Sequence, residues 1–360
     1  PNQDWEIVRP RLSGICGSDL ATIDGKSARY FEPLVSFPFI PGHEVVGDLQ
    51  DGTRVVLEPV LGCLSRNINP PCKSCQEGHL GNCEYVTFGE ISPGIQTGSC
   101  CDTGGGWSVA FAAHKSQLHP VEKDLSDEAA VMIEPAACGV HAALSTGIEP
   151  DGTVTVIGSG TLGLVTISAL RCYFPDVKIL ATARYPHQKS LALDLGADTV
   201  VAPNEIKRAV RRMTKSRAIS LSTKDGNVDR LTGGSDAVVD CVGSSESITD
   251  ALSVTRPRGK IVLVGMPSSV NLELTPLWHR EIQLVGAYTY GTEKLADGNV
   301  TRTFDLAAGL VGSAKLERLL SAVYPLSRYQ DALEHAASAG HRGAVKVAFD
   351  LRSEKERDLL

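Results

Sequence analysis

The chain has 360 residues, of which 42% are hydrophobic and 21% charged, with a formal net charge of −7. At roughly 150 residues per domain, this length predicts two domains with cores of their own. The negative charge excludes a broad electrostatic grip on nucleic acid or on an anionic membrane. No apolar run approaches the ~20 residues that span a bilayer, and the first ten residues form no signal peptide. We therefore expect a cytoplasmic protein.

The two ends and the middle of the chain differ in pattern. Residues 1 to about 135 are rich in turns and hold short β-like runs, such as 54–57. From residue 153 strands alternate with helices, at 153–157 (strand), 162–173 (helix), 177–183 (strand), 187–195 (helix), 237–240 (strand) and 260–264 (strand). Such alternation predicts parallel βαβ units. Helices follow at 303–312 and 328–337, and a strand at 344–350.

A glycine-rich loop joins the first of these strands to the first helix. It reads Gly158-Ser159-Gly160-Thr161-Leu162-Gly163. The first glycine permits the tight turn, the second lets the backbone approach a pyrophosphate, and the third lets the helix pack on the strand. The helix N-terminus adds free N–H groups for the phosphates. In this strand–loop–helix context the motif predicts a dinucleotide site, and a glycine-rich turn without a ligand is the alternative.

The end of the second strand bears on the choice of dinucleotide. NAD-binding proteins place an acid there to hold the ribose 2′-hydroxyl, whereas NADP-binding ones place an arginine for the 2′-phosphate. Arg184 follows this strand, Lys189 lies five residues further on, and no carboxylate stands at the strand end. The sequence thus favours NADP(H), with an ordinary exposed arginine as the alternative.

Ten cysteines are present, and seven of them fall between residues 63 and 138. A long chain without a secretion signal is not a disulfide scaffold, so the clustering indicates metal or reactive chemistry. Four thiolates on one loop would make a closed structural zinc site, formed by Cys63, Cys72, Cys75 and Cys83. A redox C-x-x-C motif is the alternative. Its position after two prolines, rather than before a helix, favours zinc.

A second metal site is suggested by residues that lie far apart in the chain. Cys16, the pair His43 and Glu44, and Glu134 offer a thiolate, an imidazole and carboxylates. Three protein ligands with a fourth open position are the pattern of a catalytic zinc. Taken singly, each of these residues is more often structural.

Together the motifs resemble the zinc-dependent medium-chain dehydrogenases and reductases, which include alcohol, sorbitol and threonine dehydrogenases. The resemblance covers almost the whole chain and rests on the motifs G-I-C-G-S-D at 14–19, P-G-H-E at 41–44, C-x-x-C-x7-C at 72–83, I-E-P at 133–135, G-x-G-x-x-G at 158–163, L-G-A-D at 195–198 and K-I-V-L-V-G at 260–265. It implies an α/β protein with a GroES-like β-rich catalytic domain and a doubly wound parallel Rossmann sheet. The catalytic domain would comprise residues 1–138 and 287–360, and the Rossmann domain 139–286.

The resemblance also implies roles for single residues. Cys16, His43 and Glu134 match the catalytic zinc ligands, with Cys138 as a more distant substitute for the last. Glu44 matches a carboxylate that serves as an alternative ligand, and Ser18 the hydroxyl that takes the proton of the alcohol. A homodimer or homotetramer is implied as well. Two positions depart from the family pattern. Asn69 stands where the first structural cysteine is usual, and Ala21 replaces the histidine that relays the proton.

The sequence therefore predicts a zinc enzyme that transfers a hydride between a secondary alcohol or its carbonyl product and NADP(H). Conjugate reduction of an enal or enone is a second possibility, because such a reduction needs no deprotonated alcohol and the relay histidine is missing. A non-catalytic protein that senses NADP(H) is a third, from a different class.

Overall fold

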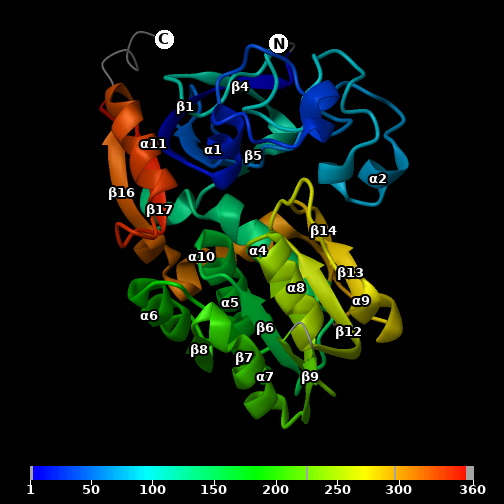
Figure 1. The fold of residues 1–360 in the computed structure, drawn as a ribbon. Helices are drawn as coiled ribbons and strands as arrows, with labels where there is room; N and C mark the ends of the chain where they lie inside the picture. Colours follow the sequence, from blue (N-terminus) through cyan, green and yellow to red (C-terminus); the bar gives the residue numbers. More distant parts are fainter. Residues whose placement is uncertain (1–2, 224–225, 296, 354–360) are drawn as a thin grey trace. The chain divides into compact units, whose positions relative to one another are not determined.

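The computed structural model describes residues 3–223, 226–295 and 297–353. The chain divides into two compact units (Figure 1). Unit 1 comprises Pro1–Ala137 and Thr289–Leu360, and unit 2 comprises Cys138–Tyr288. One helix, α4 (Ile133–Ser145), runs from the first unit into the second. Among the described residues, no helix is long and apolar enough to cross a membrane.

Unit 1 is built on a mixed sheet whose described part has the order β16-β17-β1-β2-β3-β5, with β4 paired to β1. Its strands are β1 (Trp5–Gly14), β2 (Val45–Asp48), β3 (Arg54–Leu57), β4 (Phe111–His114), β5 (Leu118–Pro120), β16 (Leu320–Pro325) and β17 (Lys346–Asp350). Among the described strand pairs of this sheet, only β16 and β17 are parallel. The first and last strands of the unit thus meet, because β17 pairs with the end of β1.

Short elements surround this sheet. The hairpin β14 (Thr292–Lys294) and β15 (Val300–Arg302) precedes helix α10, and the helices are α1 (Gly17–Ile23), α2 (Lys73–Gln76), α3 (Asp127–Ala130), α10 (Thr303–Ala314) and α11 (Tyr329–Ala337). Residues 58–110 form a long loop lobe between β3 and β4. Arg66 is fully buried in it, and its guanidinium donates to the carbonyls of Leu61, Phe88 and Gly94. One arginine thereby ties together the chain on both sides of the cysteine motif.

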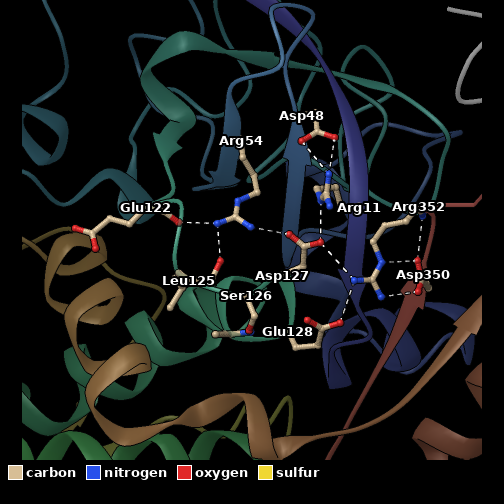
Figure 2. Close-up of polar contacts among 11 residues, drawn as sticks. Arg11, Asp48, Arg54, Glu122, Leu125, Ser126, Asp127, Glu128, Asp350 and Arg352 are labelled. Atoms are coloured by element: carbon tan, nitrogen blue, oxygen red, sulfur yellow. Dashed lines mark hydrogen bonds and ion pairs between the residues drawn. The ribbon is translucent and has the colours of Figure 1, made fainter.

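A buried carboxylate joins four elements of unit 1 (Figure 2). Asp127, at the start of α3, is 5% exposed. It accepts hydrogen bonds from Arg11 on β1 (Nε, 2.8 Å) and Arg54 on β3 (Nη1, 3.1 Å), and pairs with Arg352 beyond β17 at 3.4 Å. Asp48 and Asp350 balance the outer guanidinium groups. This network fixes α3, and with it the approach to α4, against the sheet.

Unit 2 holds a parallel sheet whose described strands have the order β13-β12-β11-β6-β7-β8. They are β6 (Thr153–Ile157), β7 (Lys178–Thr182), β8 (Thr199–Val201), β11 (Ser235–Asp240), β12 (Thr255–Leu263) and β13 (Gln283–Gly286). The helices are α5 (Thr161–Tyr173), α6 (Pro186–Asp194), α7 (Ile206–Thr214), α8 (Ser245–Val254) and α9 (Thr275–His279). The order reverses beside β6, so the sheet is doubly wound, and the predicted βαβ alternation is confirmed.

The core of unit 2 explains this order. Val238 on β11 and Ile261 on β12 are fully buried and pack with Val210 of α7 and Ile248 of α8. Central strands buried on both faces are expected to be rich in apolar side chains, as Val154, Val156 and Ile157 of β6 illustrate. The alternation does not predict the hairpin β9 (Ala218–Thr223) and β10 (Gly226–Leu231).

The network around Asp127 predicts a large stability effect from one atom change. Asp127→Asn keeps the volume but removes the charge that three guanidinium groups share. We expect the free energy of unfolding to fall by about 2–4 kcal/mol, because the arginines lose their buried partner. Urea denaturation followed by circular dichroism measures it. The exposed pair Arg328–Asp331 supplies the control, since Asp331→Asn should change stability by less than about 0.5 kcal/mol. Equal effects of the two substitutions would contradict a structural role for the network.

Candidate metal and dinucleotide sites

Cys16, His43 and Glu44 come together where β1 ends and β2 begins. Their ligand atoms all lie within 4.8 Å of one another. The backbone creates the approach, because Gly14 donates its N–H to the Glu44 carbonyl at 2.8 Å. A Cβ on Gly14 would lie 1.9 Å from Glu44 Oε2, so only glycine fits there. The close approach of the backbone at Gly14, where only glycine fits, thus brings Cys16, His43 and Glu44 together.

Asp19 orients two of these side chains from the first turn of α1. Its Oδ2 accepts the backbone N–H of Cys16 at 2.9 Å, and its Oδ1 lies 3.3 Å from Nδ1 of His43. A carboxylate on Nδ1 leaves Nε2 as the ring nitrogen for a metal. Burial is the largest single influence and alone would lower the pKa of His43, but attraction and hydrogen bonding to Asp19 and Cys16 together raise that pKa well above its usual range.

A buried lysine faces the Glu44 carboxylate. Nζ of Lys346, on β17, lies 2.6 Å from both carboxylate oxygens and donates to the Ile15 carbonyl at 3.3 Å. Both side chains are almost fully buried. Burial alone would lower the pKa of Lys346, yet attraction to Glu44 raises it. The ammonium group is therefore charged and forms a buried ion pair with Glu44.

Glu134 lies beside this cluster rather than within it. Among the described residues, the metal-ligand grouping contains Glu44 and not Glu134. Oε1 of Glu134 instead accepts a hydrogen bond from the Tyr290 hydroxyl at 2.9 Å. Burial, together with repulsion from Glu44, raises the pKa of Glu134 to about 7. Ser18 is half-buried in the first turn of α1, two residues after Cys16.

Two residues of this region were not identified from sequence. Lys346 interrupts the apolar run of a buried strand, and a charge in such a run signals a buried partner. Tyr290 carries no comparable signal, because large aromatic side chains mostly serve packing. Only the structure brings its hydroxyl to Glu134, 156 residues away in the chain.

The second cluster contains the four cysteines predicted from the loop motif. The Sγ atoms of Cys63, Cys72, Cys75 and Cys83 lie within 4.8 Å of one another, and those of Cys63 and Cys83 are 3.6 Å apart. Cys63 thus occupies the place for which Asn69 offers no thiol. Tetrahedral zinc with Zn–S bonds of about 2.3 Å sets its sulfur atoms about 3.8 Å apart, so the set fits a closed site.

Backbone N–H groups point at these sulfur atoms. Cys72 N donates to Cys63 Sγ at 3.3 Å, and Glu84 N donates to Cys72 Sγ at 3.4 Å. Tyr85 N donates to Cys83 Sγ at 3.4 Å. Such donors stabilise thiolates bound to a metal. Burial raises the pKa of Cys63 to about 11, so a cation is needed to hold the group as thiolates near neutral pH.

The dinucleotide loop has the geometry that its glycines require. Gly158 has φ +90°, in the left-handed region. A Cβ on Gly163 would lie 1.8 Å from the Gly158 carbonyl oxygen. With any other residue at position 163, helix α5 could therefore not pack so close to the loop. At Gly160 an added Cβ would meet nothing within 4 Å. The loop is therefore closed where it packs and open at the glycine that would face a pyrophosphate.

Side chains at the end of β7 support the loop and leave cations exposed. Ser159 is buried and donates to the Thr182 carbonyl at 2.8 Å, while Thr182 Oγ1 accepts from Gly158 N at 2.9 Å. Arg184, just past the strand, and Lys189, in α6, are exposed. Thr161 and Leu162 form the first turn of α5. The structure places all the predicted cofactor residues in unit 2, on the loop or on the segment that follows β7.

The pKa of Glu134 predicts a pH-dependent metal affinity. Without metal this carboxyl is protonated below about pH 7, whereas a divalent cation favours the carboxylate. Metal binding must then release this proton, so the affinity weakens as pH falls below about 7. We expect Glu134→Gln to lower the slope of log affinity against pH by about one proton in that range. Co²⁺ titration followed by visible absorption measures the slope.

The wild-type protein and the Glu134→Gln variant both contain the four-cysteine cluster, so metal binding at that cluster contributes equally to the two slopes. Glu128→Gln, which removes a carboxylate outside the cluster, should keep the wild-type slope. Identical slopes for wild type and Glu134→Gln would show that Glu134 does not sense the metal.

Comparison with known proteins identifies the family. A family model for zinc-binding dehydrogenases matches residues 161–303, and one for the GroES-like domain of alcohol dehydrogenases matches residues 2–123. L-Idonate 5-dehydrogenase of Vitis vinifera is 28% identical over 96% of this chain and 87% of its own length. Sorbitol dehydrogenase of Bacillus subtilis is 27% identical over 93% and 87%.

Solved structures agree on the fold. L-Idonate 5-dehydrogenase of Escherichia coli superposes with a TM-score of 0.72 at 24% identity, covering 97% of this chain and 92% of its own. The matched models, the zinc-ligand clusters and the doubly wound sheet lead to one conclusion: the chain belongs to the zinc-binding medium-chain dehydrogenases, as a zinc-dependent alcohol dehydrogenase with GroES-like and Rossmann parts.

Proposed function

We propose that this protein oxidises a secondary hydroxyl group of a polyhydroxylated substrate with NADP⁺, and catalyses the reverse reduction. The observation that carries the proposal is the buried group of Cys16, His43 and Glu44, braced by Asp19 and Lys346. The relatives named for idonate and sorbitol support a polyol as the substrate class, because sorbitol is a polyol and idonate a polyhydroxy acid.

Cys16, His43 and Glu44 would hold the catalytic zinc, and Glu134 is the carboxylate beside it. Bound there, zinc lowers the pKa of a hydroxyl group, and a nicotinamide accepts the hydride. The protein contributes the surroundings for both. Asp19 holds the His43 ring, and Lys346 forms an ion pair with Glu44. Because the cluster is buried, water competes weakly for the open position.

Proton movement in this proposal begins at Ser18. Its hydroxyl lies on the first turn of α1, two residues from Cys16, where it can accept the proton that the substrate gives up. Ala21 offers no side chain that could pass the proton on. Tyr290 donates to Glu134 and so keeps one oxygen of that carboxylate engaged. Glu134 is thereby held in one orientation beside the metal ligands.

The cofactor would bind through the 158–163 loop. The open space at Gly160 lets the pyrophosphate reach the N–H groups at the start of α5. Arg184 supports NADP⁺ over NAD⁺, because a guanidinium can pair with the 2′-phosphate in a bidentate manner and Lys189 adds a second positive charge nearby.

Removal of the imidazole tests the metal role. We expect His43→Ala to lower kcat/KM for a secondary polyol by at least about 1000-fold, because the zinc site loses a ligand. The NADP⁺ dissociation constant, followed by nucleotide fluorescence, should change less than about threefold, since the loop lies elsewhere in the chain. His341→Ala, at an exposed position, is the control and should keep wild-type activity.

Products of the same assay decide between the candidate activities. A ketone formed from a secondary alcohol supports the proposal. A saturated carbonyl formed from an enal shows conjugate reduction instead. NADP(H) binding without turnover of any polyol, secondary alcohol or enal shows a sensor.

Arg184 yields a separate prediction about the cofactor. Arg184→Ala should lower kcat/KM for NADP⁺ by about 10–100-fold and leave that for NAD⁺ within about twofold, since only NADP⁺ carries the 2′-phosphate. Lys178 lies at the opposite end of β7, the strand that precedes Arg184, so Lys178→Ala should leave kcat/KM unchanged for both cofactors. A wild-type preference for NAD⁺, or equal losses with both cofactors, would overturn the assignment.

A further inference from the structure

Helix α7 and the residues that follow it present a surface of positive charge. The apolar side of the helix, with Ile206 and Val210, is buried in the core of unit 2. Five cations on and just after the helix are exposed, and none of them has an ion pair among the described residues: Arg208, Arg211, Arg212, Lys215 and Arg217. We call these five the basic face. At 3.6 residues per turn, its first four members lie within about 100° around the helix axis, opposite the buried side.

Acidic residues do not neutralise the basic face. Neither aspartate nor glutamate occurs from residue 206 to residue 224. Lys207 is on the same helix but is not counted in the face, because it shares a groove with Glu246 and Asp250 of α8. Like charges four residues apart, such as Arg208 and Arg212, destabilise a helix. A surface of negative charge would relieve this repulsion.

An exposed apolar pair follows the basic face in the chain, since α7 leads directly into β9 (Figure 1). Ile219 and Leu221 of β9 are 60% and 63% exposed. They are two residues apart and so share one face of the strand, whereas Ser220, on the other face, donates a hydrogen bond to Asp229 of β10. A two-stranded hairpin is only marginally stable in water. A partner that covers Ile219 and Leu221 would therefore stabilise it.

The combination of cations and aliphatic side chains favours an anionic lipid surface as the partner. Lipid headgroups supply the negative charge, and the boundary between headgroups and acyl chains accepts Ile and Leu side chains without a shaped pocket. Nucleic acid would also supply the charge, but proteins that bind single strands stack the bases on aromatic rings. The chain contains no Phe, Tyr or Trp from residue 186 to residue 277.

We propose that the basic face and the pair Ile219 and Leu221 form a docking surface for an anionic membrane. The net charge of −7 excludes a broad electrostatic grip, but at physiological salt charges are screened beyond about 8 Å. Five local cations can therefore attract a nearby surface although the whole chain is acidic. None of these residues belongs to the zinc-ligand clusters or to the 158–163 loop. Docking thus requires neither turnover nor cofactor.

Sedimentation with lipid vesicles tests the basic face. We expect the wild-type protein to bind phosphatidylcholine vesicles that contain about one-third phosphatidylserine, but not pure phosphatidylcholine, and to bind less as salt rises from about 0.05 to about 0.5 M. Arg208→Gln combined with Arg212→Gln should lower the partition coefficient at least about tenfold. The control, Lys123→Gln with Lys294→Gln, removes two exposed cations of unit 1 and should lower it less than about twofold.

A second pair of substitutions tests the apolar contribution. Ile219→Ser combined with Leu221→Ser should lower the partition coefficient about tenfold, because less aliphatic surface enters the lipid. Val300→Ser with Val323→Ser changes two exposed strand positions of unit 1 and should leave it within about twofold. If the arginine variant fails to fold, as circular dichroism would show, this pair still decides, because both of its positions are exposed.

Three results would overturn the proposal. The first is equal binding of the wild-type protein to neutral and anionic vesicles. The second is wild-type binding by the folded arginine variant or by the Ile219 and Leu221 variant. The third is tighter binding to polyuridine RNA than to the anionic vesicles, which would make the partner a nucleic acid.

Discussion

The ion pair between Lys346 and Glu44 is the interaction on which the cluster of Cys16, His43 and Glu44 in unit 1 depends. It joins residues 302 positions apart, and both side chains are almost fully buried. Leaving either charge without its partner would cost about 3–5 kcal/mol, so the fold must bring β17 to the Cys16 cluster. The pairing of β17 with β1 does this, since Ala348 stands opposite Gly14. The Glu44 carboxylate is thus held in place by the sheet itself.

The sequence predicted the elements whose patterns are local. The glycine loop, the apolar strands of unit 2 and the four cysteines each lie within a short segment, where spacing carries the information. Cys63 was predicted as the fourth ligand although Asn69 holds the usual position. In the structure the loop folds back over nine residues and brings the Cys63 sulfur to the backbone N–H of Cys72. Arg66 is buried three residues after Cys63, and its guanidinium donates hydrogen bonds to backbone carbonyls of that loop. No pattern in the sequence predicts these contacts.

Contacts between distant segments could not be predicted in the same way. The sequence offered Glu44 and Glu134 as carboxylates for one metal, and only the fold distinguishes their surroundings. Glu44 lies with Cys16 and His43 and faces Lys346, while Glu134 accepts from Tyr290. The network of Asp127 with three arginines is equally non-local. Charged residues are usually solvated, so nothing in their spacing indicates which of them are buried together.

Charge balance explains why the Cys16 cluster suits a divalent cation. With His43 counted as neutral, Asp19, Cys16, Glu44 and Glu134 can carry four negative charges against the single positive charge of Lys346. A buried excess of three negative charges is unfavourable unless a cation or protons compensate it. Protons do so in the metal-free protein, since the pKa values of both His43 and Glu134 are raised. Zinc would replace these protons with a fixed charge, leaving the thiolate and carboxylates ionised where an alcohol must lose its own proton.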